Sequence, residues 1–360
     1  MNRNVQKFVT RNSPVPLYIQ VKEYIKQQIA KGIFLPKQQI PSERKLCAIF
    51  NISHITVRQA LIELTKEGIL FRVPGKGTYV NDNINLLSTV KTETIGVVIP
   101  EIKNSYFTHF ITDLLLGIKS VSSKQNFSLL LYTENENNYI RDIEEKKIVG
   151  LILTNPKIED IRITMLKNKN FPFVVIGNPT EQGVKSVDND NILIGYHLTK
   201  LLIKYGYKKI GFINGPQHLT VSKDRLEGYK KAITKFNIYF DEKLVKYGDF
   251  SEENGYKNTY QLIKHNVDAL IGADDLIAIG ILQALKKIGK KIPDDIAVVG
   301  CNNSPFTAYI HPALTTFDIF PYLLGKKAME KLAKILKGEL TEERTIIKGE
   351  IIIRESIAKK

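Results

Sequence analysis

From Ile95 onward the chain alternates short apolar runs with amphipathic stretches, and this alternation restricts the fold more than any other feature. Seven runs have the composition of buried strands: IGVVI at 95–99, SLLLY at 128–132, GLILT at 150–154, FVVIG at 173–177, KIGFIN at 209–214, DALIG at 268–272 and IAVVG at 296–300. Helical stretches of about 10–20 residues separate most of them, which predicts a parallel α/β sheet. Roughly 265 residues are long for one sheet, so we expect two lobes, each with its own sheet.

The first 80 residues follow a different pattern. An apolar stripe with a spacing of four predicts a first helix, and it consists of Leu17, Val21, Ile25 and Ile29. Ser42 is placed to cap a second helix and Ser53 a third. Two short strands are expected at 69–73 and 78–80, around the turn PGKG at 74–77. The sequence therefore predicts three helices followed by a hairpin.

Much of the basic charge lies in this first part. Residues 1–80 hold 13 lysines and arginines but only four acids, whereas the whole chain has a net charge of +15. A strongly basic N-terminal segment, followed by a longer segment with a smaller net positive charge, favours a polyanionic partner, most often nucleic acid. Residues 81–92 are polar and without a clear period. We expect a polar tail at 1–13, a small domain at 14–80, a linker at 81–92 and a large domain at 93–360.

The second and third helices are joined by a tight break and have the arrangement of a helix-turn-helix at about 43–62. The residues of the third helix that can face outward are Ser53, His54, Ile55, Thr56, Arg58 and Gln59. Its N-terminus suits a phosphate, Arg58 can pair with guanine and Gln59 can contact a base edge. Lys76 stands between two glycines at the hairpin tip, where it can approach a DNA backbone. Thr56 also fits an ordinary helix position, and Lys76 a solvated turn.

In the body, polar residues follow the ends of the predicted strands, where open α/β sheets bind ligands. They are Asn104 to Phe107, Asp188 to Asn191, Asp224-Arg225, Asp274-Asp275 and Asn302-Asn303. Carboxylates, amides, one arginine and aromatic rings suit a polyhydroxylated or amide-rich small molecule. The alternative for Asp188, Asp190 and Asp275 is that each caps the helix that follows it.

Residues 16–80 resemble the winged helix-turn-helix head of the GntR-type bacterial regulators. The matching motifs are PSER at 41–44, S-x-x-TVR-x-AL at 53–61, L-x-x-x-GIL at 64–70 and GKGT-x-V at 75–80. The resemblance implies that Arg44 and Arg58 contact DNA, although Arg44 also fits a solvated helix position. His54 departs from the arginine that is common in the family, and this departure can alter base preference.

Residues 94–355 resemble the effector domain of the LacI/GalR repressors, which is similar to periplasmic sugar-binding proteins. The motifs include IGVVIPEIKNSYF at 95–107, VDNDN at 187–191, DRLEGY at 224–229, GDFSEENGY at 248–256, DDLIAIG at 274–280 and HPALTTF at 311–317. The resemblance implies that Arg225 holds ligand hydroxyls or a carboxylate. It also implies that the ligand packs on Phe107 and Phe250 and donates hydrogen bonds to Asp190 and Asp274. Tyr106, in the same segment as Phe107, is a further candidate for effector binding.

One departure concerns the ligand. The family commonly has two aspartates after G-(Y/F), whereas this chain has GCNN at 300–303. Asn302 therefore replaces a carboxylate, and its amide can both donate and accept a hydrogen bond. This pattern therefore favours a plain sugar less strongly than the usual family pattern does. Arg225 has a structural alternative as well, an ion pair with Asp224 or Glu227.

The sequence contains no recognisable catalytic constellation, and its six histidines lack metal-ligand spacing. We therefore predict no enzymatic activity, cofactor or metal. We expect a cytoplasmic homodimer, free of membranes, that binds double-stranded operator DNA as a repressor of a carbohydrate-use operon. A GntR-type head on a LacI-type body resembles the arabinose repressors, which implies a sugar effector such as a pentose. The alternatives are a regulator that senses a nucleoside, a solute-binding protein without a regulatory role, and an α/β enzyme with a basic appendage.

Overall fold

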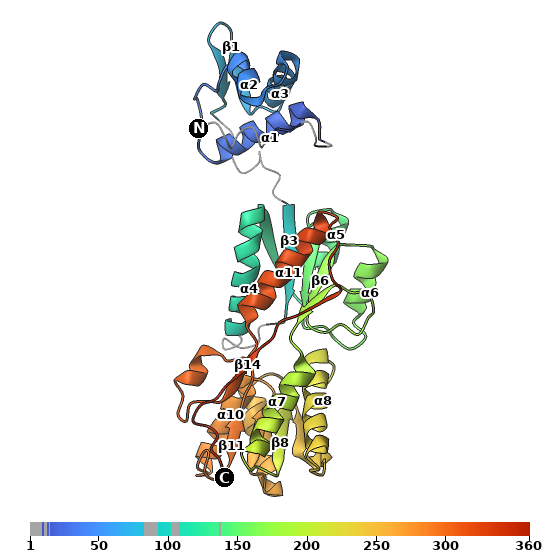
Figure 1. Cartoon of the computed structure of the whole chain (residues 1–360), viewed down its shortest axis with the longest axis vertical. Coiled ribbons are helices and arrows are strands. Elements are labelled where there is room, and N and C mark those ends of the chain that lie inside the picture. The colour runs from blue at the N-terminus through green and yellow to red at the C-terminus, as the bar shows by residue number, and fades with distance from the viewer. Residues whose placement is uncertain (1–8, 11–12, 14, 83–92, 102–107, 137) are drawn as a thin grey trace. The chain divides into compact units, whose positions relative to one another are not determined.

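The computed structural model describes residues 9–10, 13, 15–82, 93–101, 108–136 and 138–360. The chain forms two compact units, residues 1–92 and 93–360, which we call the head and the body (Figure 1). Most of the expected linker, residues 83–92, and most of the expected tail at 1–13 lie outside the described residues.

The head consists of three helices and a hairpin: α1 (Leu17–Ala30), α2 (Glu43–Phe50), α3 (His54–Lys66), β1 (Leu70–Val73) and β2 (Gly77–Val80). The hydroxyls of Ser42 and Ser53 accept hydrogen bonds from backbone N–H groups at 3.3 Å, which confirms both predicted N-caps. Val21, Ile25 and Ile29 of the α1 stripe are buried against α3 in a core that also includes Val9, and Leu17 packs against this core partly buried. The expected helix-turn-helix followed by a wing is therefore present.

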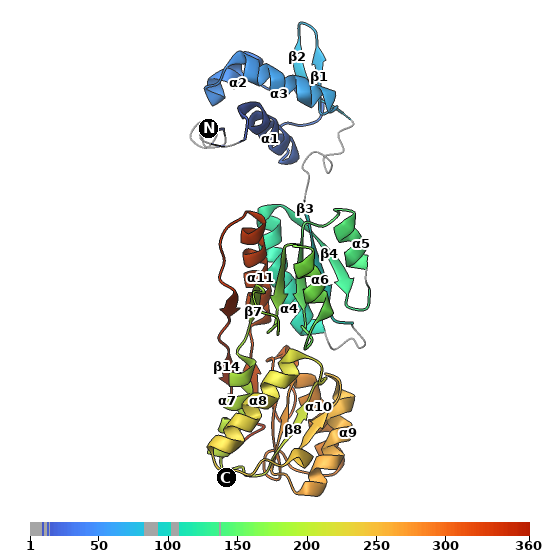
Figure 2. The same cartoon turned by 90° about the vertical axis from the view of Figure 1, so that its right-hand side faces the viewer.

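The first lobe of the body is built on a six-stranded parallel sheet with the order β13-β7-β6-β5-β3-β4. Its strands are β3 (Glu93–Ile99), β4 (Phe127–Thr133), β5 (Gly150–Thr154), β6 (Phe173–Ile176), β7 (Ser186–Asp188) and β13 (Arg344–Ile346). Helices α4 (Thr108–Ser122) and α11 (Pro321–Leu336) cover one face, and α5 (Asn138–Glu144) and α6 (Ile161–Asn168) cover the other (Figure 2).

The second lobe contains a four-stranded parallel sheet with the order β11-β10-β8-β9. Its strands are β8 (Ile210–Asn214), β9 (Val245–Tyr247), β10 (Ala269–Gly272) and β11 (Ala297–Val299). The helices α7 (Asn191–Lys204) and α8 (Thr220–Lys235) form one packed pair, and α9 (Glu252–Leu262) and α10 (Asp275–Lys287) form the other. A separate antiparallel pair joins β12 (Thr316–Asp318) and β14 (Glu350–Ile352).

The strands explain why this fold forms. All five residues of β5 and of β8 are buried, without alternation, as expected of central strands in a parallel sheet with helices on both faces. All seven apolar runs identified in the sequence form strands of these two sheets. The α/β class, the two lobes and the small head are therefore confirmed.

The chain passes between the lobes three times: from β7 to α7, from β12 to α11 and from β13 to β14. The buried side chain of Asn189 links these crossings by hydrogen bonds. Its Nδ2 donates hydrogen bonds to the carbonyl oxygen of Ile319 at 3.1 Å and to that of Ile347 at 2.9 Å. Since each of the three residues lies on a different crossing, Asn189 ties the three segments that must bend when the lobes open or close.

Candidate functional site

The exposed face of α3 is basic and polar. Val57, Ala60, Leu61 and Leu64 are buried, whereas His54, Arg58 and Gln59 are exposed together with Ile55, which is 80% exposed. An apolar group at such a position can contact a thymine methyl in the major groove. Arg44 is exposed on α2, so the predicted DNA contacts lie on solvent-accessible surfaces of the helix-turn-helix.

Ser53 and Thr56 are engaged with each other. Their hydroxyl oxygens lie 2.8 Å apart, and the Ser53 hydroxyl also accepts a hydrogen bond from the Thr56 backbone N–H. These contacts agree with the helix-residue alternative for Thr56. They leave Arg58, Gln59 and the backbone N–H groups of the first turn as the groups best placed for DNA.

Gln39 supports the wing tip, which is the turn at 74–77 between β1 and β2. Its Nε2 donates a hydrogen bond to the carbonyl oxygen of Lys76 at 2.7 Å, and Gln39 also forms a β-bridge with Tyr79. Tyr79 stacks on Phe71, with ring centroids 5.6 Å apart. Lys76 is exposed at the end of this supported hairpin.

The acids of the head are held in ion pairs. Lys22 contacts Glu63 at 2.8 Å and Glu67 at 2.6 Å, and hydrogen bonding to Glu63 and Glu67 raises the pKa of Lys22 to about 12. Glu43 lies 3.5 Å from Arg72. Within the described part of the head, Arg44, Arg58 and Lys76 form no ion pair, so their charge remains available to a phosphate backbone.

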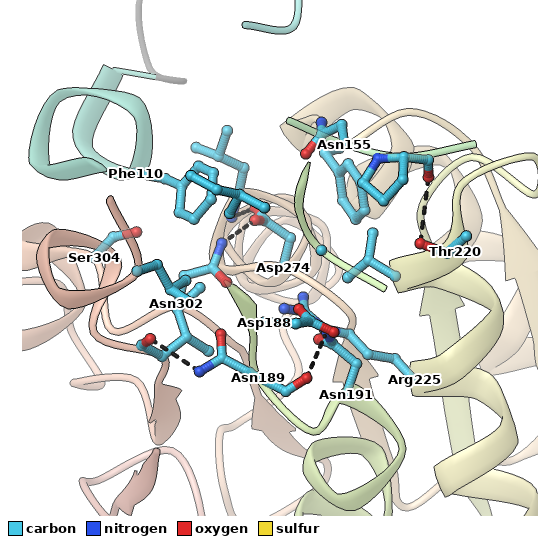
Figure 3. A pocket seen from close by; sticks show the side chains of 18 of the residues that line it. Phe110, Asn155, Asp188, Asn189, Asn191, Thr220, Arg225, Asp274, Asn302 and Ser304 are labelled. Atoms are coloured by element: carbon cyan, nitrogen blue, oxygen red, sulfur yellow. Dashed lines mark hydrogen bonds between the residues drawn. The ribbon is translucent and has the colours of Figure 1, made fainter. Parts of the chain in front are cut away.

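A cleft of about 100 Å³ lies between the two lobes of the body (Figure 3). The first lobe contributes Phe110, Asn155, Pro156 and Asp188, and the second contributes Asn191, Thr220, Val221, Arg225, Phe250, Asp274, Leu276 and Asn302. Polar groups and rings therefore converge from both lobes, as is typical of small-molecule sites.

The lobes are hydrogen-bonded to each other along one rim of this cleft. The backbone N–H of Thr220 donates to the carbonyl oxygen of Pro156 at 3.1 Å, and the Ile158 N–H donates to that of His218 at 2.8 Å. Lys157 and Leu219 form an antiparallel bridge between these two contacts. The rim is thus a short strand pairing that any separation of the lobes must break.

Four of the predicted effector residues line the cleft: Arg225, Phe250, Asp274 and Asn302. Tyr106 and Phe107 lie outside the described residues. Asp190 is placed elsewhere, because its carboxylate caps α7 through the Leu193 N–H at 2.9 Å and lines a separate groove beside the crossings. Its neighbours Asp188 and Asn189 line the cleft instead.

Arg225 is only 5% exposed and joins three elements. From α8, its Nε donates to Oδ1 of Asn191 at the start of α7, at 3.0 Å, and its Nη1 donates to the carbonyl oxygen of Ala273 after β10. The alternative ion pairs are not formed among the described residues: Asp224 accepts a hydrogen bond from Asn178 Nδ2 at 2.7 Å, and Glu227 pairs with Lys231 at 3.6 Å.

Asp274 and Asn302 form a pair at the floor of the cleft. Nδ2 of Asn302 donates to Oδ2 of Asp274, whose Oδ1 accepts the Leu276 N–H at 2.7 Å as the cap of α10. This arrangement leaves Oδ1 of Asn302 buried without a partner among the described residues. A buried acceptor of this kind favours a ligand that donates a hydrogen bond to it. Burial raises the pKa of Asp274 to about 6.

Asp275 does not act as a cap. It is fully buried and accepts hydrogen bonds from the Thr316 hydroxyl at 2.6 Å and the Ser304 N–H at 2.7 Å. Burial, and next the neighbouring Asp274 charge, raise the pKa of Asp275 to about 8. At neutral pH the protonated form is therefore favoured in the folded body.

This raised pKa predicts a pH-dependent stability. Between the ordinary aspartate pKa of about 4 and the folded value of about 8, the folded state retains a proton that the unfolded chain has lost, so stability falls as the pH rises. Each pH unit in that window lowers the free energy of unfolding by at most about 1.4 kcal/mol. Between pH 5 and pH 8, the free energy of unfolding of Asp275→Asn should therefore rise by about 1 kcal/mol or more relative to that of wild type.

Urea unfolding of both proteins at the two pH values measures this difference. The exposed Asp294→Asn is the matched control and should track wild type. A constant difference between Asp275→Asn and wild type at pH 5 and pH 8 would contradict the raised pKa.

Sequence reasoning missed several residues of the cleft, which are His109, Phe110, Asn155, Thr220, Val221 and Ser304. Some are in the first turns of helices or in loops after strands, and the lobes bring them together. The strand-end rule could have found Asn155, because it directly follows β5. No periodicity or motif marked the others.

In the described ranges, no three or more His, Cys, Asp or Glu side chains cluster so that they could hold a metal ion. Similarly, no helix there has the length and apolar character needed to cross a bilayer.

Comparison with known proteins decides the family. Residues 17–80 match the gntR family of bacterial regulatory proteins, and residues 199–357 match the periplasmic binding protein-like domain. The transcriptional regulator MalR of Streptococcus pneumoniae is 32% identical over 77% of this chain and 84% of MalR. The regulator CelR of Thermobifida fusca is 29% identical over 81% of this chain and 89% of CelR. The chain belongs to the LacI/GalR family of transcriptional regulators.

Solved structures agree with this assignment. A LacI-type regulator from Bacillus cereus subsp. cytotoxis superimposes with a TM-score of 0.72 at 29% identity, over 75% of this chain and 99% of that one. A CelR–cellobiose complex superimposes with a TM-score of 0.69 at 28% identity, over 85% and 91%. As a LacI/GalR-family regulator with a GntR-type head, the protein is a DNA-binding transcriptional regulator and not an enzyme. The alternative of a solute-binding protein without a regulatory role is therefore wrong.

Proposed function

We propose that this LacI/GalR-family regulator is a repressor of a carbohydrate-use operon, and that a sugar bound in the cleft controls its affinity for operator DNA. The observation that carries the proposal is the cleft itself. Polar groups from both lobes surround a space that is also lined by Phe110 and Phe250, which is the combination a sugar ring requires.

Three further points support a sugar. The CelR structure is described as a cellobiose complex, and this chain resembles it over most of its length. Oδ1 of Asn302 is a buried acceptor without a partner among the described residues, and a sugar hydroxyl can donate to it. The two lobes are linked by three crossings that permit closure on a ligand.

On this proposal, residues 14–80 bind DNA through Arg44, His54, Arg58, Gln59 and Lys76. Residues 93–360 bind the effector and hold the dimer together, and residues 81–92 join the two parts. Because the operator is on the chromosome, the protein acts in the bacterial cytoplasm.

Calorimetric titration of the protein with a panel of sugars tests the effector class. The panel contains L-arabinose, D-xylose, D-ribose, D-glucose, cellobiose, maltose and adenosine, the last as a nucleoside. We expect at least one sugar to bind with a micromolar or tighter Kd. Binding of adenosine alone would contradict the proposal and favour the nucleoside alternative, in which Phe110 or Phe250 stacks on a base.

The dimer should form through the edge of the first lobe. Strand β4 is the last strand of the six-stranded sheet, so one of its sides is unpaired. Leu131 on β4 is 48% exposed and Leu116 on α4 is 54% exposed. Exposed leucines at an open sheet edge are a site of association between chains.

Leu131→Asp should therefore shift the protein from dimer to monomer and weaken operator binding at least 10-fold, because a palindromic site needs two heads. Sedimentation equilibrium at micromolar concentration measures the first effect. Leu340→Asp is the matched control, since Leu340 is fully exposed on a separate loop. A dimer that survives Leu131→Asp would mean that another surface joins the two copies.

A further inference from the structure

A second compartment opens directly beside the cleft. It has a volume of about 250 Å³, and it shares His109, Phe110, Asn302 and Ser304 with the cleft. In Figure 3, Phe110 from the first lobe and Asn302 from the second lie on the same side of the cleft, with Ser304 beyond them. These residues form a common wall, and we call the two spaces the inner and outer compartments.

The sizes of the compartments limit the ligand. Small-molecule sites usually measure roughly 300–1,000 Å³. The inner compartment, at about 100 Å³, is well below this range on its own, whereas the two compartments together reach its lower end. A ligand that uses the available space must therefore extend past Phe110 and Asn302.

The outer compartment has a fixed polar wall. Asn303 Nδ2 donates to Oδ2 of Asp318 at 2.8 Å, and the Phe320 N–H donates to Oδ1 of the same carboxylate at 2.8 Å. Arg354 Nη2 in turn donates to Oδ1 of Asn303 at 2.8 Å. The side chains of Asn303 and Asp318 thus already have structural partners, and they connect the loop after β11 to the crossing from β12 to α11.

The groups that remain for a ligand are those of a sugar site. Tyr322, 45% exposed, offers a ring, and Asp113 and Ser304 offer a carboxylate and a hydroxyl. The described lining contains no lysine or arginine but two carboxylates, Asp113 and Asp318. A phosphorylated sugar would meet two carboxylates there without a lysine or arginine to offset their charge, so the compartment favours an uncharged molecule.

We propose that the effector is an uncharged sugar of two linked rings, with one ring in the inner compartment and the second in the outer compartment. The inference rests on the proposed function and narrows it, because a single pentose would leave the outer compartment empty. Tyr322 and Asp113 then determine specificity: they contact only the second ring.

Paired titrations of the full-length protein test the proposal. The pairs are D-xylose with xylobiose, and D-glucose with cellobiose and with maltose. We expect at least one disaccharide to bind 30-fold or more tightly than its own monosaccharide. Tyr322→Ala should remove most of that difference and leave monosaccharide binding unchanged, and Asp113→Ala should act in the same direction. Val221→Ala, which changes only the inner compartment, should weaken both sugars of a pair.

The outcomes separate this inference from the function it rests on. If in every pair that binds the monosaccharide is bound as tightly as its disaccharide, a sugar-responsive repressor remains intact but the two-ring effector is overturned. The two-ring effector is equally overturned if Tyr322→Ala and Asp113→Ala, each shown by thermal unfolding to be folded, bind the disaccharide like wild type. If no sugar of any pair binds but L-arabinose or D-ribose does, the two-ring effector is wrong and the sugar effector stands. If no sugar of either set binds, both are wrong.

Discussion

Replacing Arg225 with alanine should abolish the response at effector concentrations that just saturate the wild-type protein, and it should leave the operator affinity of the ligand-free protein nearly unchanged. Arg225 lines the cleft of the body, whereas the DNA contacts are in the head. Hydrogen bonds from a charged group contribute about 1.5–3 kcal/mol each, so the effector Kd should rise roughly 10- to 150-fold. Calorimetry and operator titration on the same preparation measure the two quantities.

Arg225→Ala should also lower the stability of the folded body. Arg225 donates to Asn191 Oδ1 and to the Ala273 carbonyl oxygen, so alanine leaves these buried acceptors without their donor and should lower stability by about 1–3 kcal/mol. Arg225→Lys retains the charge but not the planar fork, and it should recover part of the stability with little of the ligand affinity. A folded Arg225→Ala protein that still responds normally would show that the effector does not use this cleft.

Arg58→Ala should reduce operator affinity by about 1–3 kcal/mol and relax specificity at one base pair in each half-site. The side chain is exposed on α3 and forms no ion pair within the described part of the head. Lys76→Ala at the wing tip should weaken binding to all DNA sequences about equally and lower the salt dependence of binding, because we expect Lys76 to contact the phosphate backbone of DNA.

The measurement compares selected operator, single-base variants and random DNA by fluorescence anisotropy. Lys66→Ala is the matched control, because Lys66 is an exposed cation in the last turn of the same helix. Equal losses on operator and random DNA for Arg58→Ala would assign Arg58 to the backbone and not to a base.

How much of the fold could be predicted depends on the length of each element. Long buried strands such as β3 and β5 stand out in the sequence because helices cover both faces and nearly every residue is apolar. Strands of three residues, such as β7 and β13, are too short to show a period, and their pairing depends on a partner more than 150 residues away. The two lobes could be predicted from the sequence, but the three segments that pass between them could not.

The residues of the site likewise divide into those that a local sequence pattern indicates and those that only the tertiary structure brings together. Asp274 and Asn302 could be predicted because they follow the ends of β10 and β11, which meet at one edge of a sheet. Arg225 lies within α8, and its ligand role was implied by the resemblance of DRLEGY at 224–229 to the family motif. Phe110 and Thr220 could not, since they enter the cleft only through the approach of one lobe to the other. The double hydrogen bond of Asn189 to two other crossings is also a tertiary property that no local pattern records.

The central claim is that a small molecule bound in the body controls DNA binding by the head. The most direct test is anisotropy of the full-length protein on its best DNA site, selected from a random library, with and without a saturating concentration of the sugar that binds by calorimetry. We predict at least a 10-fold loss of affinity with the sugar present, and no comparable DNA binding by residues 93–360 alone. An operator affinity that is the same in the free and the sugar-saturated protein would contradict the claim.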